Sequence, residues 1–263
     1  MAQILADVGG TNVRFACAVN GQIDPARTRR FQNDDFASFD AALVAFLKQA
    51  GVANIETLTV AIAGPVTGPT ARLTNRDWQF NAAMLCKDHN AGNVYLINDL
   101  SALGCALDKI GTDGLRDVLP VMGSAESNTQ RLVVGIGTGF NVSPVLSHAG
   151  GVTCLTAEAG LGSLPSRVRR PLETFLGISA EWVECVEDVM SGPGLSRLHA
   201  AATGQTPMGA RDIIERAHSG DPAATASLNV FAHMLGEWIQ DLRLLYMPMG
   251  GIFLAGSVVR GLL

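Results

Sequence analysis

The chain has 263 residues, of which 48% are hydrophobic and 16% charged, and its formal net charge is −5. This balance excludes a disordered or coiled-coil protein. The lack of a basic stripe predicts that neither nucleic acid nor an anionic membrane is a partner. The cysteines form no C-x-x-C pair, which predicts reduced thiols in a cytoplasmic protein. Neither a signal peptide nor a membrane span is expected, because Asp7 interrupts the first apolar run and no later run is long enough.

Apolar runs in the first part of the chain alternate between strand and helix patterns. Residues 3–19, QILADVGGTNVRFACAV, predict a hairpin of two strands around a glycine turn. Residues 36–52 have apolar side chains at spacings of three and four, which predicts a helix that ends at a glycine. Short β-branched runs predict strands at 57–66 and 93–100, and a helix is expected directly after the second of these.

A turn-rich, polar segment at 111–128 predicts the boundary between a small domain, residues 1–110, and a larger one, residues 111–263. The larger domain begins with residues 131–146, RLVVGIGTGFNVSPVL, which repeat the pattern of strand, Gly-and-Thr turn and strand. The remaining segments predict helices and a final strand, at 171–178, 180–190, 209–219, 224–247 and 250–263.

The two glycine turns, one in each half of the chain, point to an anionic ligand. Glycine tolerates positive φ and a close ligand, and successive turn N–H groups form an anion-binding concavity. Asp7, just before the first turn, would repel a phosphate unless a cation such as Mg²⁺ lay between them. A dinucleotide site is not supported, because a strand follows the glycines, and the chain has no Walker sequence. A plain hairpin turn is the alternative for each loop.

Asn98 and Asp99 stand at the end of a predicted strand, in LINDLSAL. Ligands of open α/β sheets gather beyond the carboxyl ends of strands. Phosphoryl transfer to a hydroxyl needs a carboxylate that orients the hydroxyl and takes its proton, which Asp99 could do, while Asn98 could bind a neighbouring hydroxyl. The alternative is that both residues only cap the helix that follows.

Two further carboxylates occupy unusual settings. Glu158 lies in the turn TAEAGLGS, and Glu187 precedes DVMSGPGL. A carboxylate can accept paired hydrogen bonds from adjacent sugar hydroxyls, so both residues are candidates for gripping a polyol. A solvated turn glutamate and an exposed helix face are the respective alternatives.

Together these stretches resemble the bacterial glucokinase family, within the sugar kinase, actin and Hsp70 superfamily. The resemblance covers nearly the whole chain and rests on motifs in the family's order: DVGGTNVRFA, AIAGPVTG, LTNRDWQF, LINDLSAL, GIGTGFNV, AEAG, EDVMSGPGL and GGIFLAGSVV. It implies an α/β, two-domain ribonuclease H-like (actin-like ATPase) fold with mixed sheets flanked by helices. It also implies phosphorylation of the 6-hydroxyl of D-glucose by ATP with Mg²⁺, which feeds glycolysis.

The resemblance also assigns roles to individual residues. Asp99 would be the general base. The sugar would be bound by Asn75, Asn98, Glu158 and Glu187. The β- and γ-phosphates of ATP would be bound by Asp7, Gly9, Gly10, Thr11 and Asn12. Asp7 would also bind the Mg²⁺ ion indirectly. The second phosphate loop would be Gly137, Thr138 and Gly139. The adenosine would lie near Gly250, Gly251 and Gly256.

The chain departs from the family pattern in ways that bear on specificity. Leu161 stands where the family usually has a sugar-binding histidine, and alanines flank Glu158 in place of glycines. Asn141 occupies a position close to the second loop where a glycine is usual. The sequence also stops after GGIFLAGSVVRGLL, which predicts a C-terminal domain that is truncated, either because the sequence is incomplete or because the protein is a shortened homologue. A kinase for another hexose, or a sugar or nucleotide sensor of the same fold, are therefore the alternatives, and a homodimer is the arrangement common in the family.

Overall fold

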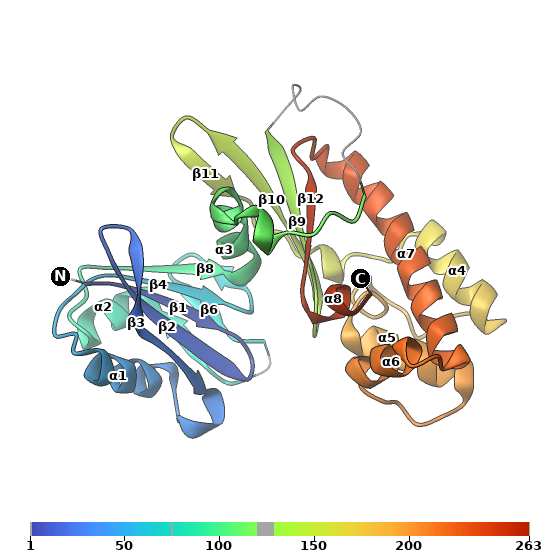
Figure 1. Ribbon diagram of the computed structural model, residues 1–263, viewed down its shortest axis with the longest axis horizontal. Coiled ribbons are helices and arrows are strands. Elements are labelled where there is room, and N and C mark those ends of the chain that lie inside the picture. The colour runs from blue at the N-terminus through green and yellow to red at the C-terminus, as the bar shows by residue number, and fades with distance from the viewer. Residues whose placement is uncertain (1, 75, 120–128, 263) are drawn as a thin grey trace. The chain divides into compact units, whose positions relative to one another are not determined.

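The computed structural model describes residues 2–74, 76–119 and 129–262 of the chain (Figure 1). The chain divides into two compact units, Met1–Ala102 and Leu103–Leu263. This division falls within one helix and slightly earlier than the boundary predicted between residues 110 and 111. Residues 120–128 of the predicted linker lie outside the described part of the chain.

The N-terminal unit is built on a five-stranded mixed sheet in the order β3-β2-β1-β4-β8. Its strands are β1 (Ala2–Val8), β2 (Asn12–Val19), β3 (Gln22–Gln32), β4 (Ile55–Ile62) and β8 (Asn93–Asn98). The first three strands pair antiparallel, which confirms the predicted hairpin, and β4 and β8 add in parallel.

The core of this unit follows from the period-2 pattern of its strands. Alternate residues of β1 are buried, and β1 packs in one core with helix α1 (Phe39–Ala50). Helix α1 begins where the Ser38 side chain accepts the Ala41 N–H, and it ends at Gly51, whose φ of 64° only glycine adopts readily. The rings of Phe15 and Phe46 stack with centroids 4.9 Å apart. The predicted helix and its glycine stop are therefore confirmed.

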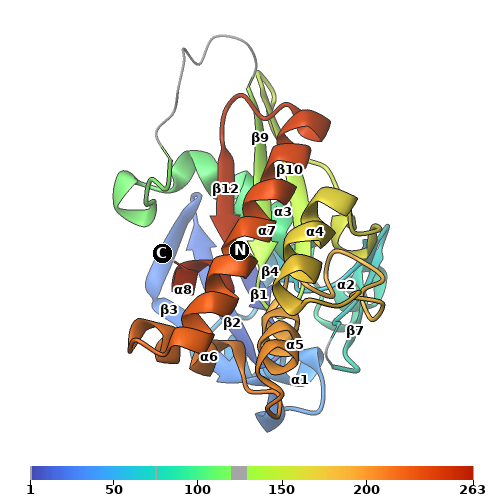
Figure 2. The same ribbon diagram turned by 90° about the vertical axis from the view of Figure 1, so that its right-hand side faces the viewer.

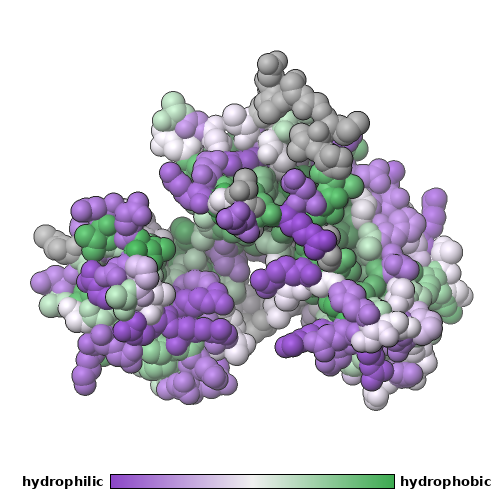
Figure 3. All heavy atoms as spheres, viewed as in Figure 1, coloured by the Kyte–Doolittle hydropathy of each residue, from purple (hydrophilic) through white to green (hydrophobic). Residues whose placement is uncertain are grey.

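A small three-stranded sheet and a second helix complete the unit. These elements are β5 (Val66–Thr67), β6 (Thr70–Arg72), β7 (Gln79–Asn81) and α2 (Ala82–Asp88). On the face shown in Figure 3, hydrophilic side chains cover most of the N-terminal unit.

The C-terminal unit repeats the topology of the first. Its four-stranded sheet has the order β11-β10-β9-β12, with strands β9 (Gln130–Ile136), β10 (Phe140–His148), β11 (Gly151–Cys154) and β12 (Ile252–Ala255). Strands β9, β10 and β11 pair antiparallel and β12 joins β9 in parallel, as β1, β2, β3 and β4 do. The weak sequence repeat is thus part of a structural repeat of four strands, β1 to β4 and β9 to β12.

Helices cover the C-terminal sheet. Helices α4 and α7 lie across one face of it, and their apolar residues share one core with β9 (Figure 2). Helix α3 (Asp99–Ala106) contains the division between the two units. The helices that follow it are α4 (Ser166–Leu176), α5 (Gly192–Thr203), α6 (Ala210–His218), α7 (Pro222–Tyr246) and α8 (Ser257–Leu262). The single 3₁₀ turns are η1 (Asn33–Asp35), η2 (Leu107–Lys109), η3 (Thr112–Gly114) and η4 (Ala159–Leu161). No helix in the described ranges is long and apolar enough to cross a membrane.

The helix predicted at 180–190 is wrong. This segment forms turns, and two of its backbone N–H groups bond to carbonyls outside the segment. Val186 donates to the Gly162 carbonyl at 3.0 Å, and Glu187 donates to the Gly160 carbonyl at 2.8 Å. The Asp188 carboxylate accepts two further N–H groups of the same turn. The tertiary pairing therefore overrides the apolar spacing.

The aromatic core of the N-terminal unit provides a test of this packing. Phe46 is 0% exposed, whereas Val44 on the same helix is 55% exposed. We expect Phe46→Ala to lower the free energy of unfolding by about 3–5 kcal/mol, because a buried ring leaves a cavity. Val44→Ala should change it by no more than about 0.5 kcal/mol. Urea unfolding followed by circular dichroism measures both, and equal losses would contradict the assignment of the core.

Candidate functional site

The first predicted phosphate loop joins β1 to β2 in the N-terminal unit. Its N–H at Gly9 donates to the Asn12 carbonyl at 3.0 Å. Thr11 is exposed at the tip, and Gly9, Gly10 and Asn12 are partly exposed. The loop is thus an accessible turn of main chain at the end of two central strands.

Asp7 projects from β1 directly before this loop. Its carboxylate accepts a hydrogen bond from Arg14 Nη1 at 2.7 Å, and both side chains are about half exposed. Arg14 lies opposite Asp7 in the β1–β2 register, a pairing that sequence reasoning missed although the hairpin spacing determines it. No group of three or more His, Cys, Asp or Glu side chains gathers into a metal cage in the described ranges. An exposed carboxylate beside a phosphate loop nevertheless fits Mg²⁺, which keeps several waters and takes most other ligands from phosphates.

The loop glycines do not use the backbone freedom that was expected of them. None of Gly9, Gly137 and Gly139 has a positive φ. A Cβ at Gly139 would lie 2.5 Å from Glu187 Oε2, so a side chain there would displace the Glu187 carboxylate, whereas a Cβ at Gly137 would meet no atom within 4 Å.

Asp99 lies at the carboxyl end of β8 and is the first residue of α3. The N–H of Leu100 donates to Asp99 Oδ1 at 2.9 Å. Burial raises the pKa of Asp99 above the ordinary aspartate value, the Leu100 N–H acts in the opposite direction, and the negative charge of Asp7 raises it further. A half-buried carboxylate of this kind is a better proton acceptor than an exposed one.

Asn98 makes structural hydrogen bonds at both ends of its side chain. Nδ2 donates to the Gly64 carbonyl at 3.2 Å, and Oδ1 accepts the Leu100 N–H at 3.0 Å. Asn98 and Asp99 therefore do cap the start of α3, as the alternative interpretation predicted. Their proposed roles in binding and catalysis stay predictions. Asn75, the remaining sugar candidate of this unit, lies outside the described residues.

The second predicted phosphate loop joins β9 to β10 in the C-terminal unit. The Gly137 carbonyl accepts the N–H of Gly192 at 2.7 Å, and the Gly137 N–H donates to the Gly139 carbonyl at 2.9 Å. Thr138 is exposed at the tip. Gly192 is the first residue of α5, so the loop rests on the start of that helix.

Glu187 is bound to this loop. Its Oε2 accepts the N–H of Phe140 at 2.8 Å, and its own N–H donates to the Gly160 carbonyl at 2.8 Å. It lies in a turn and is half-buried, so the interpretation as an exposed helix face is wrong. The pairing with Gly160 also brings Glu187 beside the segment that contains Glu158.

Glu158 is held by a residue whose role sequence reasoning missed. Asn141 Nδ2 donates to the Ala157 carbonyl at 2.6 Å and to Glu158 Oε2 at 3.1 Å, and Asn141 Oδ1 accepts the Ala159 N–H at 3.0 Å. Partial desolvation raises the pKa of Glu158, and the negative charge of Glu187 adds to the increase. Two carboxylates this close can accept hydrogen bonds from the hydroxyls of one sugar. Asn141 therefore acts through its amide and not through a positive φ.

The three glycines expected near adenosine do not lie together. Gly256 follows the carboxyl end of β12, and its φ is 111°. A Cβ there would collide with the Ile136 carbonyl, just before the second phosphate loop. Gly250 and Gly251 lie before the amino end of β12, where the Gly250 N–H donates to the Gln130 carbonyl at the amino end of β9. Of these three glycines, Gly256 alone lies at the same end of the strands as the second predicted phosphate loop.

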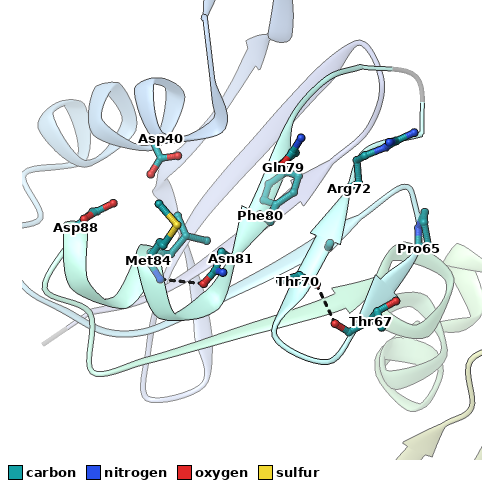
Figure 4. A pocket seen from close by; sticks show the side chains of 12 residues that line it. Asp40, Pro65, Thr67, Thr70, Arg72, Gln79, Phe80, Asn81, Met84 and Asp88 are labelled. Atoms are coloured by element: carbon teal, nitrogen blue, oxygen red, sulfur yellow. Dashed lines mark hydrogen bonds between the residues drawn. The ribbon is translucent and has the colours of Figure 1, made fainter.

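A pocket of about 800 Å³ in the N-terminal unit contains none of the predicted site residues (Figure 4). Asp40 and Asp88 lie at one end of it and Arg72 at the other. Asn81 on its wall caps α2 by accepting the Met84 N–H at 3.1 Å. Pro65 and Thr67 of AIAGPVTG and Gln79 and Phe80 of LTNRDWQF line this pocket, but none of the residues to which the resemblance assigns a role does.

Comparisons with known proteins agree with the two sheets and their loops. The family model for glucokinase matches residues 4–263. The glucokinase of Caulobacter vibrioides is 30% identical over 268 residues, which cover 97% of this chain and 80% of that protein.

Solved structures share the fold. A glucokinase from an Antarctic psychrotroph is similar with a TM-score of 0.77 and 27% identity, over 98% of this chain and 84% of that one. A glucokinase of the ROK family from Streptomyces griseus, solved with glucose and AMPPNP, has a TM-score of 0.63 and 20% identity, over 99% of this chain and 85% of that one.

These matches confirm the expected sugar kinase fold with its mixed sheets and flanking helices. Because the family model spans nearly the whole chain, including both glycine hairpins and the strand that leads to Asp99, the chain belongs to the glucokinase family and is a sugar kinase.

Proposed function

We propose that this sugar kinase transfers the γ-phosphoryl group of ATP to the 6-hydroxyl of D-glucose. The observation that carries the proposal is the setting of Asp99, a half-buried carboxylate at a strand end with a pKa raised by burial and by Asp7. The glucose and AMPPNP held by the Streptomyces griseus relative support the choice of substrates. A sensor would have no need of such a carboxylate.

In the proposed mechanism Asp99 orients the hydroxyl and accepts its proton as the oxygen attacks phosphorus in line. Glu158 and Glu187 accept hydrogen bonds from other hydroxyls of the sugar. The N–H groups of the two hairpin loops bind the phosphates. Mg²⁺, bound to Asp7 through water, would neutralise phosphate charge. No covalent enzyme intermediate is required.

Leu161 favours a second candidate, a kinase of the same mechanism for another hexose. It lies in η4, is 67% exposed, and follows the Glu158 turn at the position where the family usually has histidine. A leucine there supplies no hydrogen bond, so a sugar with a different substituent could be preferred.

Replacing the proposed base should separate chemistry from binding. We expect Asp99→Asn to keep sugar binding and to lower kcat by about 10²- to 10⁴-fold, the usual contribution of a general base. Asparagine can still accept the Leu100 N–H, so the start of α3 is preserved. A coupled assay of ADP release and calorimetric titration of glucose measure the two quantities. Asp113→Asn, on an exposed turn, is the control, and a near-normal kcat in Asp99→Asn would remove Asp99 from the mechanism.

The raised pKa of Asp99 predicts the pH dependence of kcat/KM. The base must be unprotonated, so activity should fall as pH decreases through a pKa above the ordinary aspartate value of 3.8. Asp7→Asn removes a negative charge that raises this pKa, and it should therefore move the acid limb to lower pH as well as reduce the rate. A limb that stays in place would show that another group controls it.

A hexose panel tests the specificity. If D-glucose is the substrate, Leu161→His should lower its KM by about 2- to 13-fold, because one added hydrogen bond is worth about 0.5–1.5 kcal/mol. Leu155→His, at another exposed leucine of the same unit, should have no effect. A wild-type chain that prefers mannose or an amino sugar, with no gain for glucose in Leu161→His, would favour the second candidate.

A further inference from the structure

Asn33 is a fully buried polar residue of the N-terminal unit that no motif had singled out. It is 0% exposed and begins η1, directly after β3. Its Nδ2 donates to the carbonyl oxygens of Gly9 at 2.8 Å and Gly10 at 3.1 Å, and its own N–H donates to the Thr11 carbonyl at 2.9 Å. Three successive carbonyl groups of the first phosphate loop therefore converge on one residue.

The amide oxygen of Asn33 indicates that asparagine stands here because of the hydrogen bonds that the amide nitrogen donates to the loop. Asn33 Oδ1 is buried and has no hydrogen-bond partner in the part of the chain that the structure describes. Leaving a buried acceptor unpaired costs free energy. An apolar residue would avoid that cost but could not donate to Gly9 and Gly10. The presence of asparagine is explained by the two donated hydrogen bonds.

Those bonds also determine where the loop N–H groups point. The C=O of Gly9 and the N–H of Gly10 belong to one planar trans peptide unit and point in opposite directions, and the same holds for the C=O of Gly10 and the N–H of Thr11. Because both carbonyls point toward Asn33, both N–H groups point away from it. Within the described residues, neither N–H has a hydrogen-bond acceptor. Two adjacent unpaired donors that face outward form an anion site.

Asn33 is held in turn from the following segment. Arg76 Nη1 donates to the Asn33 carbonyl at 3.3 Å, and the same guanidinium forms an ion pair with Asp34. The guanidinium also lies over the ring of Trp78, 5.4 Å from its centroid. These contacts hold the backbone at Asn33, while its side-chain amide is held by the bonds to Gly9 and Gly10. Such bonds lower the cost of ordering the loop when a ligand binds.

We propose that Asn33 is a positioning residue for the nucleotide: it orients two peptide planes so that the N–H groups of Gly10 and Thr11 bind the phosphate chain. The identity of the ligand as ATP rests on the proposed function. The loop geometry itself indicates only an anionic ligand, such as a polyphosphate.

The test compares Asn33→Ala, which removes both side-chain donors, with Asn33→Ser, which retains one. We expect the KM for ATP to rise about tenfold or more in Asn33→Ala and by a smaller factor in Asn33→Ser, while the KM for glucose stays within about twofold. Phe46→Ala is the control for lost stability, because that ring lies in the core shared by α1 and β2 and makes no bond to the loop. Equal increases in both KM values, or the same pattern in Phe46→Ala, would overturn the proposal.

Calorimetric titration with inorganic tripolyphosphate, without sugar, separates this proposal from the proposed function. If the wild-type chain binds tripolyphosphate and Asn33→Ala weakens that binding about tenfold, the positioning role stands even if no hexose is phosphorylated. If the wild-type chain phosphorylates glucose but Asn33→Ala and Asn33→Ser bind tripolyphosphate normally, the positioning role is wrong and the kinase stands. A wild-type chain that binds neither tripolyphosphate nor ATP would overturn both. Asn33→Ser is the smaller change and keeps the comparison possible if Asn33→Ala fails to fold.

Discussion

A loop that binds phosphate through backbone N–H groups needs partners for its carbonyl oxygens on the opposite side, because each carbonyl and the next N–H share one rigid peptide plane. This constraint recurs in both units. In the first loop the carbonyls of Gly9 and Gly10 are bound by Asn33, and in the second the Gly137 carbonyl is bound by the N–H of Gly192. In each case the partner comes from a segment outside the hairpin, so the hairpin by itself does not determine the direction of its donors.

Hydrogen bonds also connect the second loop to the residues proposed to bind the sugar. Glu187 accepts the Phe140 N–H at the end of the loop and donates its own N–H to Gly160. Asn141, one residue further along β10, holds Glu158. Two carboxylates and the second predicted phosphate loop therefore form one hydrogen-bonded assembly in the C-terminal unit.

The two sheets explain why each unit has a similar hairpin loop, whereas the proposed catalytic carboxylate occurs in the N-terminal unit. Strands β9 to β12 reproduce the arrangement of β1 to β4, so each unit has a hairpin loop at its central strands. The N-terminal sheet continues with β8, and the four-stranded sheet has no counterpart in the described residues. Asp99 follows β8, close enough to Asp7 for that charge to raise its pKa. The added strand thus brings a carboxylate close to Asp7, beside the predicted phosphate loop of the N-terminal unit.

By itself the sequence determined the elements whose bonds are local. The glycine hairpins, the helix that ends at Gly51 and the strand before Asp99 follow from period and turn chemistry, and the order of the motifs was enough to predict the family. Only the tertiary structure decided the rest. The segment 180–190 has helical spacing, but it forms turns in which the N–H groups of Glu187 and Val186 donate to the carbonyls of Gly160 and Gly162. Asn33 lies in none of the motifs, and the hydrogen bonds of Asn141 were not predicted, because the partners of both residues come from other elements of the fold. Periodicity reports which side of an element is buried, whereas the direction of a carbonyl or a carboxylate is set by a partner that only folding supplies.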